Sequence, residues 1–195
     1  FMHHSINNLI RIEKEIQLKI KEYKKNEKIP KIIAVSKTFP MIDILPLINH
    51  GHINFGENKV QESVTKWTDI KHKFTHIKLH MIGKLQTNKV KYVIPLFDYI
   101  HTLDNLKLAE KISNEQVKRK KNLKIFIQVN VGQEEQKNGV LIEHAENFYN
   151  ECKVNLGLDI IGLMCLPPNK ENPSKYFMEI NKISKNLNLK DMSLG

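Results

Sequence analysis

Residues 32–38 read Ile-Ile-Ala-Val-Ser-Lys-Thr, an apolar run that ends in a serine and a lysine. A short apolar run without polar alternation is typical of a strand that is covered on both faces, as in a parallel sheet. Pro30 separates this run from the segment before it. Residues 125–129 and 160–163 have the same character, and we therefore predict a parallel α/β sheet.

After this run, strand patterns alternate with helical patterns along the chain. The predicted strands are 32–36, 53–55, 76–82, 99–102, 124–131, 159–166 and 191–194, and the predicted helices between them are 42–49, 59–70, 86–94, 105–119, 142–151 and 174–186. An amphipathic helix precedes them, because Leu9, Ile12, Ile16, Ile20 and Tyr23 recur at spacings of three and four. Either a TIM-type (β/α) barrel or an open doubly wound sheet fits this alternation.

The number of strands bears on how complete a barrel would be. Seven strands are predicted, and the sequence ends at Gly195, directly after the seventh. A closed barrel has eight strands, which would need about 30 further residues at this spacing. We therefore expect a single domain, residues 1–195, that is C-terminally incomplete and lacks its last βα portion.

Composition narrows the class of protein. The 195 residues carry a net charge of +10, but only Arg11 and Arg119 of the 31 basic residues are arginine, the side chain that suits bidentate reading of phosphates and bases. We therefore disfavour a nucleic-acid partner. No apolar run is long enough for a membrane span, and we expect no signal peptide. Cys152 and Cys165 give neither a disulfide framework nor a metal pattern, which favours a reducing cytoplasm.

Lys37 is the sharpest candidate for chemistry, because functional groups of parallel α/β folds gather at the carboxyl ends of the strands. A lysine that is partly desolvated there would have a lowered pKa and could attack an aldehyde. The same sequence also fits a lysine that merely leaves the strand for solvent. His80, within an apolar strand, likewise fits a core histidine. Dinucleotide, P-loop, HExxH and GxSxG motifs are absent.

Seven segments, in the same order, are similar to those of a known family. They read IIAVSKTFP (32–40), HINFGENKVQE (52–62), HMIGKLQTNK (80–89), HTLDNLKLAEKI (101–112), IFIQVNVGQEEQKNGV (125–140), IIGLMCLPP (160–168) and MSLG (192–195). Together they resemble the pyridoxal 5′-phosphate (PLP) homeostasis proteins, the YggS/PROSC family, and through them the N-terminal barrel of alanine racemase. The resemblance implies a fold-type III PLP barrel and covers residues 6–195.

The resemblance also implies which residues would contact PLP. It makes Lys37 the residue that forms the internal aldimine, a Schiff base, and it places Asn58 of the FGEN turn next to the cofactor. It puts His80, Met81 and Met164 around the ring, and it matches Ser193 to the first serine of the family's S-M-G-M-S-x-D segment. The family's second serine and its R-x-G-T segment, which bind the phosphate, have no counterpart in this chain.

For function, the resemblance implies a cytoplasmic protein of PLP homeostasis that holds the cofactor and passes it on. A racemase of this kind needs a base on each face of the substrate, and alanine racemase takes its second base from an additional domain. We therefore expect no catalytic residues, no metal and no enzyme activity, and we expect a monomer whose partners are PLP and PLP-dependent apo-enzymes. The alternatives are a PLP-dependent enzyme with weak racemase-like activity and a basic nucleic-acid-associated barrel.

Overall fold

The computed structural model describes residues 2–23, 29–132, 138–168 and 171–195. Residues 133–137 of the fifth family-like segment lie outside these ranges. The strands are β1 (Ala34–Val35), β2 (Asn54–Glu57), β3 (Lys78–Met81), β4 (Tyr99–Leu103), β5 (Lys124–Asn130), β6 (Val140–Leu141), β7 (Asp159–Cys165) and β8 (Asp191–Leu194). The helices are α1 (His4–Glu22), α2 (Met41–Asn49), α3 (Val60–Lys73), α4 (Val90–Leu96), α5 (Leu106–Arg119), α6 (Ala145–Asn150) and α7 (Ser174–Asn186).

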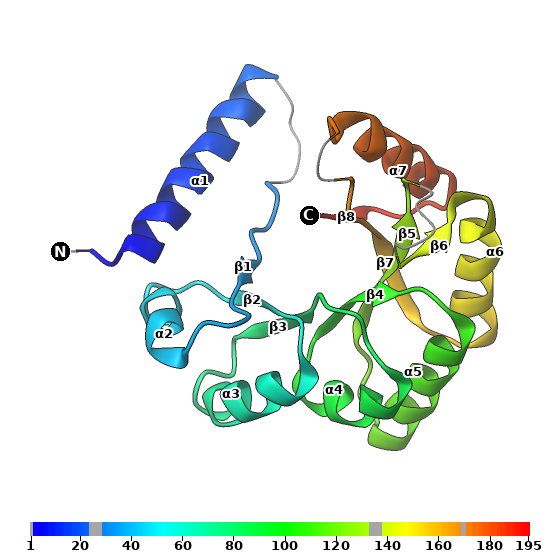
Figure 1. Cartoon of the computed structure of the whole chain (residues 1–195), viewed down its shortest axis with the longest axis horizontal. Helices are drawn as coiled ribbons and strands as arrows, with labels where there is room; N and C mark the ends of the chain where they lie inside the picture. Colours follow the sequence, from blue (N-terminus) through cyan, green and yellow to red (C-terminus); the bar gives the residue numbers. More distant parts are fainter. Residues whose placement is uncertain (1, 24–28, 133–137, 169–170) are drawn as a thin grey trace.

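The strands form one parallel sheet with the order β1-β2-β3-β4-β5-β7-β8, while β6 pairs with β5. The order rises without the reversal that defines a doubly wound sheet. Figure 1 shows that the sheet curls on itself and that helices α2 to α7 surround its outer face. The fold is therefore a curled half-barrel of the TIM type, and the first of the two predicted architectures is confirmed. Among the described residues, β1 and β8 are the two ends of the sheet and do not pair with each other.

The predicted elements are observed with shifted boundaries and one addition. The strand predicted at 32–36 is observed only as Ala34–Val35, and the two-residue strand β6 was not predicted. The predicted helix at 142–151 is divided into a 3₁₀ turn (Ile142–His144), α6 and a π-helical turn (Glu151–Asn155). Short elements of this kind carry too few residues to establish a period.

The hydrophobic core lies between the sheet and its surrounding helices. Trp67 of α3 is fully buried and packs against Phe55 of β2, with ring centroids 5.1 Å apart. Burial of a large apolar side chain stabilises the fold by about 1.5–3 kcal/mol. This core covers the outer, helix-facing side of the sheet. The inner face of the half-barrel is left to carry polar groups.

Helix α1 lies to one side of the half-barrel, near β1, and contacts α2 (Figure 1). Leu9 is its buried residue, whereas Ile12 and Leu18 are exposed. No helix within the described ranges combines the length and the apolar character needed to cross a bilayer.

Candidate functional site

Strand alternation divides the site residues between two faces of the sheet. Phe55 faces α3, so its neighbour Gly56 faces the interior of the half-barrel. Gly56 is in register with Val35 of β1 and His80 of β3. Lys37 lies in the turn that follows β1, two residues after Val35. The inner face therefore carries His80, and Lys37 stands at the carboxyl end of β1.

A chain of hydrogen bonds crosses this inner face. His80 Nε2 lies 3.1 Å from Asn54 Oδ1, His80 Nδ1 lies 2.9 Å from His101 Nε2, and His101 Nδ1 lies 2.7 Å from Ser193 Oγ. An amide oxygen only accepts, so the network assigns the proton of each imidazole to Nε2 and makes the Ser193 hydroxyl the donor to His101. These hydrogen bonds connect β2, β3, β4 and β8. All of them point the same way, because each imidazole donates from Nε2 and accepts at Nδ1.

His80 and His101, the two histidines joined by these hydrogen bonds, are held in the neutral form. Burial, and to a smaller extent the neighbouring His101, lower the pKa of His80 from 6.5 to about 3. Burial lowers the pKa of His101 to about 4. His80 stacks on Tyr99 with a centroid distance of 4.2 Å, and His101 stacks on Phe126 at 4.5 Å. Two neutral imidazoles, each packed on an aromatic ring, form a rigid polar floor within the barrel.

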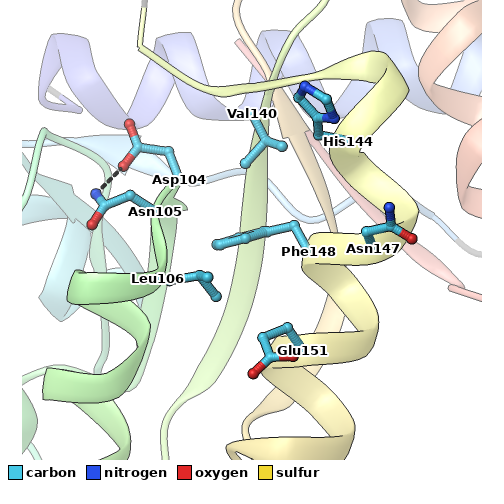
Figure 2. A pocket seen from close by; sticks show the side chains of 8 residues that line it. All are labelled: Asp104, Asn105, Leu106, Val140, His144, Asn147, Phe148 and Glu151. Atoms are coloured by element: carbon cyan, nitrogen blue, oxygen red, sulfur yellow. Dashed lines mark hydrogen bonds between the residues drawn. The ribbon is translucent and has the colours of Figure 1, made fainter.

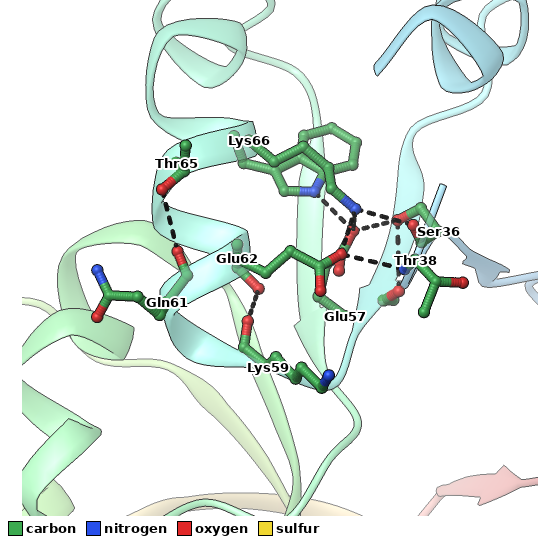
Figure 3. A network of polar contacts seen from close by, with 11 residues as sticks. Ser36, Thr38, Glu57, Lys59, Gln61, Glu62, Thr65 and Lys66 are labelled. Carbon is green, nitrogen blue, oxygen red and sulfur yellow. Dashed lines mark hydrogen bonds and ion pairs between the residues drawn. The ribbon is translucent and has the colours of Figure 1, made fainter. Parts of the chain in front are cut away.

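The turn after β1 is held by a buried polar network. Ser36 is buried and donates its hydroxyl proton to Glu57 Oε1 over 2.7 Å, and Thr38 donates its backbone N–H to Glu62 Oε1 over 3.0 Å (Figure 3). The ammonium of Lys66 lies between the two carboxylates and donates to Glu57 Oε1 and to Glu62 Oε1. Its ammonium, together with the Thr38 N–H, holds the pKa of Glu62 below 4.5.

Lys37 itself is exposed. The expected partial desolvation of its amine is therefore wrong, because β1 ends the sheet and, in the described structure, has a neighbouring strand on one side only. No described residue forms a hydrogen bond or an ion pair with the Lys37 amine. The amine is accessible to a ligand.

Asn58 directly follows β2 and lies against Gly83, in the turn after β3. A Cβ atom at Gly83 would lie 2.3 Å from the Asn58 carbonyl oxygen, so only glycine permits this approach. The Asn58 side-chain oxygen is buried and has no hydrogen-bond partner among the described residues. A buried acceptor without a partner is costly unless a ligand or water supplies the donor. It is one of two such acceptors at this end of β2, the other being Glu57 Oε2.

Met164 and Ser193 lie side by side on β7 and β8, in register with each other. Gly162, one inner-face position earlier on β7, permits the close approach of the strands, because a Cβ atom there would lie 2.1 Å from the carbonyl oxygen of Asp191. Met81 is not brought to this face. It is fully buried and in register with Glu57, on the helix-facing side, since successive strand residues point to opposite faces.

The structure thus brings His80 and Ser193 together through His101, and it places Met164 beside Ser193 and Lys37 and Asn58 at the ends of their strands. His101, Asn54, Glu57 and Lys66 were not anticipated. His101 lies two residues after Tyr99 on β4, and Asn54 lies two residues before Gly56 on β2. Strand alternation could therefore have assigned His101 and Asn54 to the inner face. No group of three or more potential metal ligands occurs within the described residues.

A hollow of about 380 Å³ lies outside the barrel, between the start of α5 and α6 (Figure 2). It is lined by Asp104, Asn105, Leu106, Val140, His144, Asn147, Phe148 and Glu151. Asn105 donates to Asp104 over 2.8 Å and also caps α5. These polar groups stabilise a helix start, and neither Lys37 nor the pair His80 and His101 lines the hollow.

The half-barrel and its strand order define a class, the alanine-racemase-like barrels. The family model "Alanine racemase, N-terminal domain" matches residues 13–190. A pyridoxal phosphate homeostasis protein of Haemophilus influenzae is 31% identical over 206 residues, which cover 97% of this chain and 84% of that protein. This chain belongs to the family of pyridoxal phosphate homeostasis proteins, which have the fold of the alanine racemase N-terminal domain.

Solved structures show the same fold. PipY of Synechococcus elongatus without PLP is 25% identical, with a TM-score of 0.78 over 92% of this chain and 88% of that one. PipY with PLP bound is 22% identical, with a TM-score of 0.72 over 91% of this chain and 87% of that one. The second likeness concerns the fold, and the bound PLP is a property of PipY.

Proposed function

We propose that this chain binds PLP on the inner face of the half-barrel and holds it as a Schiff base on Lys37, as a carrier in cellular PLP homeostasis. The observation that supports this most is the accessible, unpartnered Lys37 amine at the carboxyl end of β1. PLP supplies an electrophilic aldehyde carbon. The Lys37 amine would hold PLP reversibly through that carbon, with water released on binding and taken up again on delivery.

The residues present fit the ring and the aldehyde of this cofactor, whereas the family's phosphate-binding segments have no counterpart in this sequence. The unpartnered Asn58 oxygen can accept a hydrogen bond from a bound ligand, and Met164 and Ser193 offer an apolar and a polar contact. His80 would act from the floor of the site, since its ring nitrogens are already used by Asn54 and His101. We assign Met81 a supporting role, because its buried side chain fixes the strand that carries His80.

We further propose that the protein works as a monomer in the cytoplasm and delivers PLP to PLP-dependent apo-enzymes. The cytoplasmic assignment rests on Cys152 and Cys165, which are buried free thiols. We propose a carrier rather than an enzyme because racemisation needs a second base opposite Lys37. His80 and His101 are committed to each other and to Asn54 and Ser193, so neither is free for that role.

A spectral titration tests the proposal. PLP is added to the purified chain, to Lys37→Met and to Lys84→Met, whose exposed lysine follows β3. The absorbance of the protein-bound Schiff base should saturate in the unaltered chain and in Lys84→Met, and should be lost in Lys37→Met. Equal titration curves for the two variants would show that PLP reacts with lysines in general and would overturn the assignment. Sedimentation in the same samples tests the monomer.

A further inference from the structure

Nothing in the side chain of Lys37 fixes its direction, since no described residue holds its amine. Its orientation must therefore come from the backbone. Two peptide planes flank the Lys37 Cα atom, one shared with Ser36 and one shared with Thr38. If both planes are held, the φ and ψ angles of Lys37 are fixed, and so is the direction of its Cα–Cβ bond.

Both planes are held, and by the same ion pair (Figure 3). The ammonium of Lys66 donates to the carbonyl oxygen of Ser36 over 3.0 Å, and the same oxygen accepts the Phe39 N–H over 3.2 Å across the turn, so two donors hold the first plane. Glu62 Oε1 accepts the N–H of Thr38 over 3.0 Å, which fixes the second. Lys66 and Glu62 are themselves joined at 3.0 Å, one turn apart on α3.

The backbone at this turn needs such support. Thr38 has a φ of +67°, in the left-handed region that a β-branched residue rarely adopts. Strain of this kind persists where the surroundings hold it, and it gathers at functional positions. The strained residue directly follows Lys37, and the hydrogen bond to Glu62 is the contact that holds its N–H.

The ion pair rests in turn on a buried carboxylate. Glu57 is fully buried, and its Oε1 accepts from the Ser36 hydroxyl, the Lys66 ammonium and Trp67 Nε1. The three donors of Lys66 are used by Ser36, Glu57 and Glu62, and its side chain is 9% exposed. Lys66 is thus a committed cation, unlike its accessible neighbour Lys37.

We propose that Lys66 and Glu62, supported by Glu57, are positioning residues for Lys37: their ion pair clamps the two peptide planes around it and aims its amine into the half-barrel. This proposal rests on the proposed role of Lys37 and adds the groups that give this lysine its preference over the other exposed lysines. A lysine whose backbone is not held would react with an aldehyde like any surface lysine.

The test compares the full-length chain with Glu62→Gln, Glu62→Leu, Thr38→Gly and the double variant Glu62→Leu/Thr38→Gly. Each is incubated with PLP, reduced with borohydride for short times and digested, and the initial rate of labelling is measured at Lys37 and at Lys84. Amide hydrogen exchange of Thr38, measured without PLP, reports the clamp directly.

Glu62→Gln keeps an oxygen acceptor, so Thr38 should stay protected and Lys37 labelling should be retained. Glu62→Leu should lose the protection and slow Lys37 labelling about tenfold, with Lys84 unchanged. Glycine relieves the strain at position 38, so Thr38→Gly alone should label normally. The double variant should recover thermal stability but still label Lys37 slowly.

A purely structural role predicts the opposite for the double variant, namely that labelling returns with stability. Normal Lys37 labelling in that variant, or in Glu62→Leu after loss of Thr38 protection, would overturn the clamp while leaving Lys37 as the PLP residue. Equal labelling of Lys37 and Lys84 in the unaltered chain would overturn both proposals.

Discussion

Acidification from pH 7.5 to 5.5 should remove stability through the two histidines on the barrel floor. His80 is 4% exposed and His101 is 1% exposed. Their pKa values in the folded chain are about 3 and about 4, against 6.5 for an unperturbed histidine. The neutral forms are therefore the ones that the fold selects.

The sign and the size of the effect follow from proton linkage. Between pH 7.5 and 5.5 the unfolded chain takes up a proton on each histidine and the folded chain on neither, so the free energy of unfolding falls as the pH falls. Each histidine contributes a loss of about 1.4 kcal/mol over this window, and the pair about 2.7 kcal/mol. Below about pH 4 the folded form begins to protonate as well, and the loss levels off.

Other groups with shifted pKa values are separable from this pair. Burial also lowers the pKa of the half-buried His52, which adds a smaller effect of the same sign. The carboxyls of Glu62 and Glu115 have pKa values below 4.5, so the stability they contribute is lost only below this window. The interval from pH 7.5 to 5.5 therefore reports mainly on buried histidines.

Urea unfolding at pH 7.5, 6.5 and 5.5 measures the effect, with the exposed His144→Gln as the matched control. The unaltered chain and His144→Gln should each lose about 2.7 kcal/mol, and the ring-proton resonances of His80 and His101 should not titrate in this range. A loss below about 1 kcal/mol, or titration of either resonance near pH 6.5, would refute the assignment of two buried neutral histidines.

Three further predictions concern the strands, the thiols and the chemistry. Gly162→Ala should destabilise the fold by about 1–3 kcal/mol, because the new Cβ would clash with the Asp191 carbonyl oxygen; an unchanged urea midpoint would contradict the close approach of β7 and β8. Burial raises the pKa of Cys152 to about 12 and of Cys165 to about 11, so both thiols should resist iodoacetamide at pH 8 until urea is added; rapid alkylation of the native chain would contradict this. With PLP and L-alanine the protein should form no D-alanine, for want of a second base; sustained conversion that is lost in Lys37→Met would show an enzyme.

The fold was accessible from the sequence because its strands are short apolar runs at regular spacing. Residues 124–130 and 159–165 are buried enough to lack polar alternation, which is the signal of a parallel sheet. The strand β6 was not predictable, because Val140–Leu141 is too short to show a period. The choice of barrel over open sheet required the observed strand order.

The site was predictable only in part. Lys37 and Asn58 follow from their place at strand ends, and alternation could have assigned His80 and Met81 to opposite faces. The clamp around Lys37 depends on contacts between residues from three segments, with Glu62 and Lys66 marked in the sequence only by their spacing of four. Nothing in the local sequence indicates that Thr38 adopts a left-handed conformation, since threonine there would normally stay extended.

Peptide mapping after borohydride reduction at one equivalent of PLP tests whether a single lysine holds the cofactor. The chain has 31 basic residues, all but two of them lysine, so unselective reaction would spread the label widely. We expect most of the reduced adduct on Lys37. Adduct distributed over the exposed lysines, with Lys37 no more modified than Lys84, would contradict it.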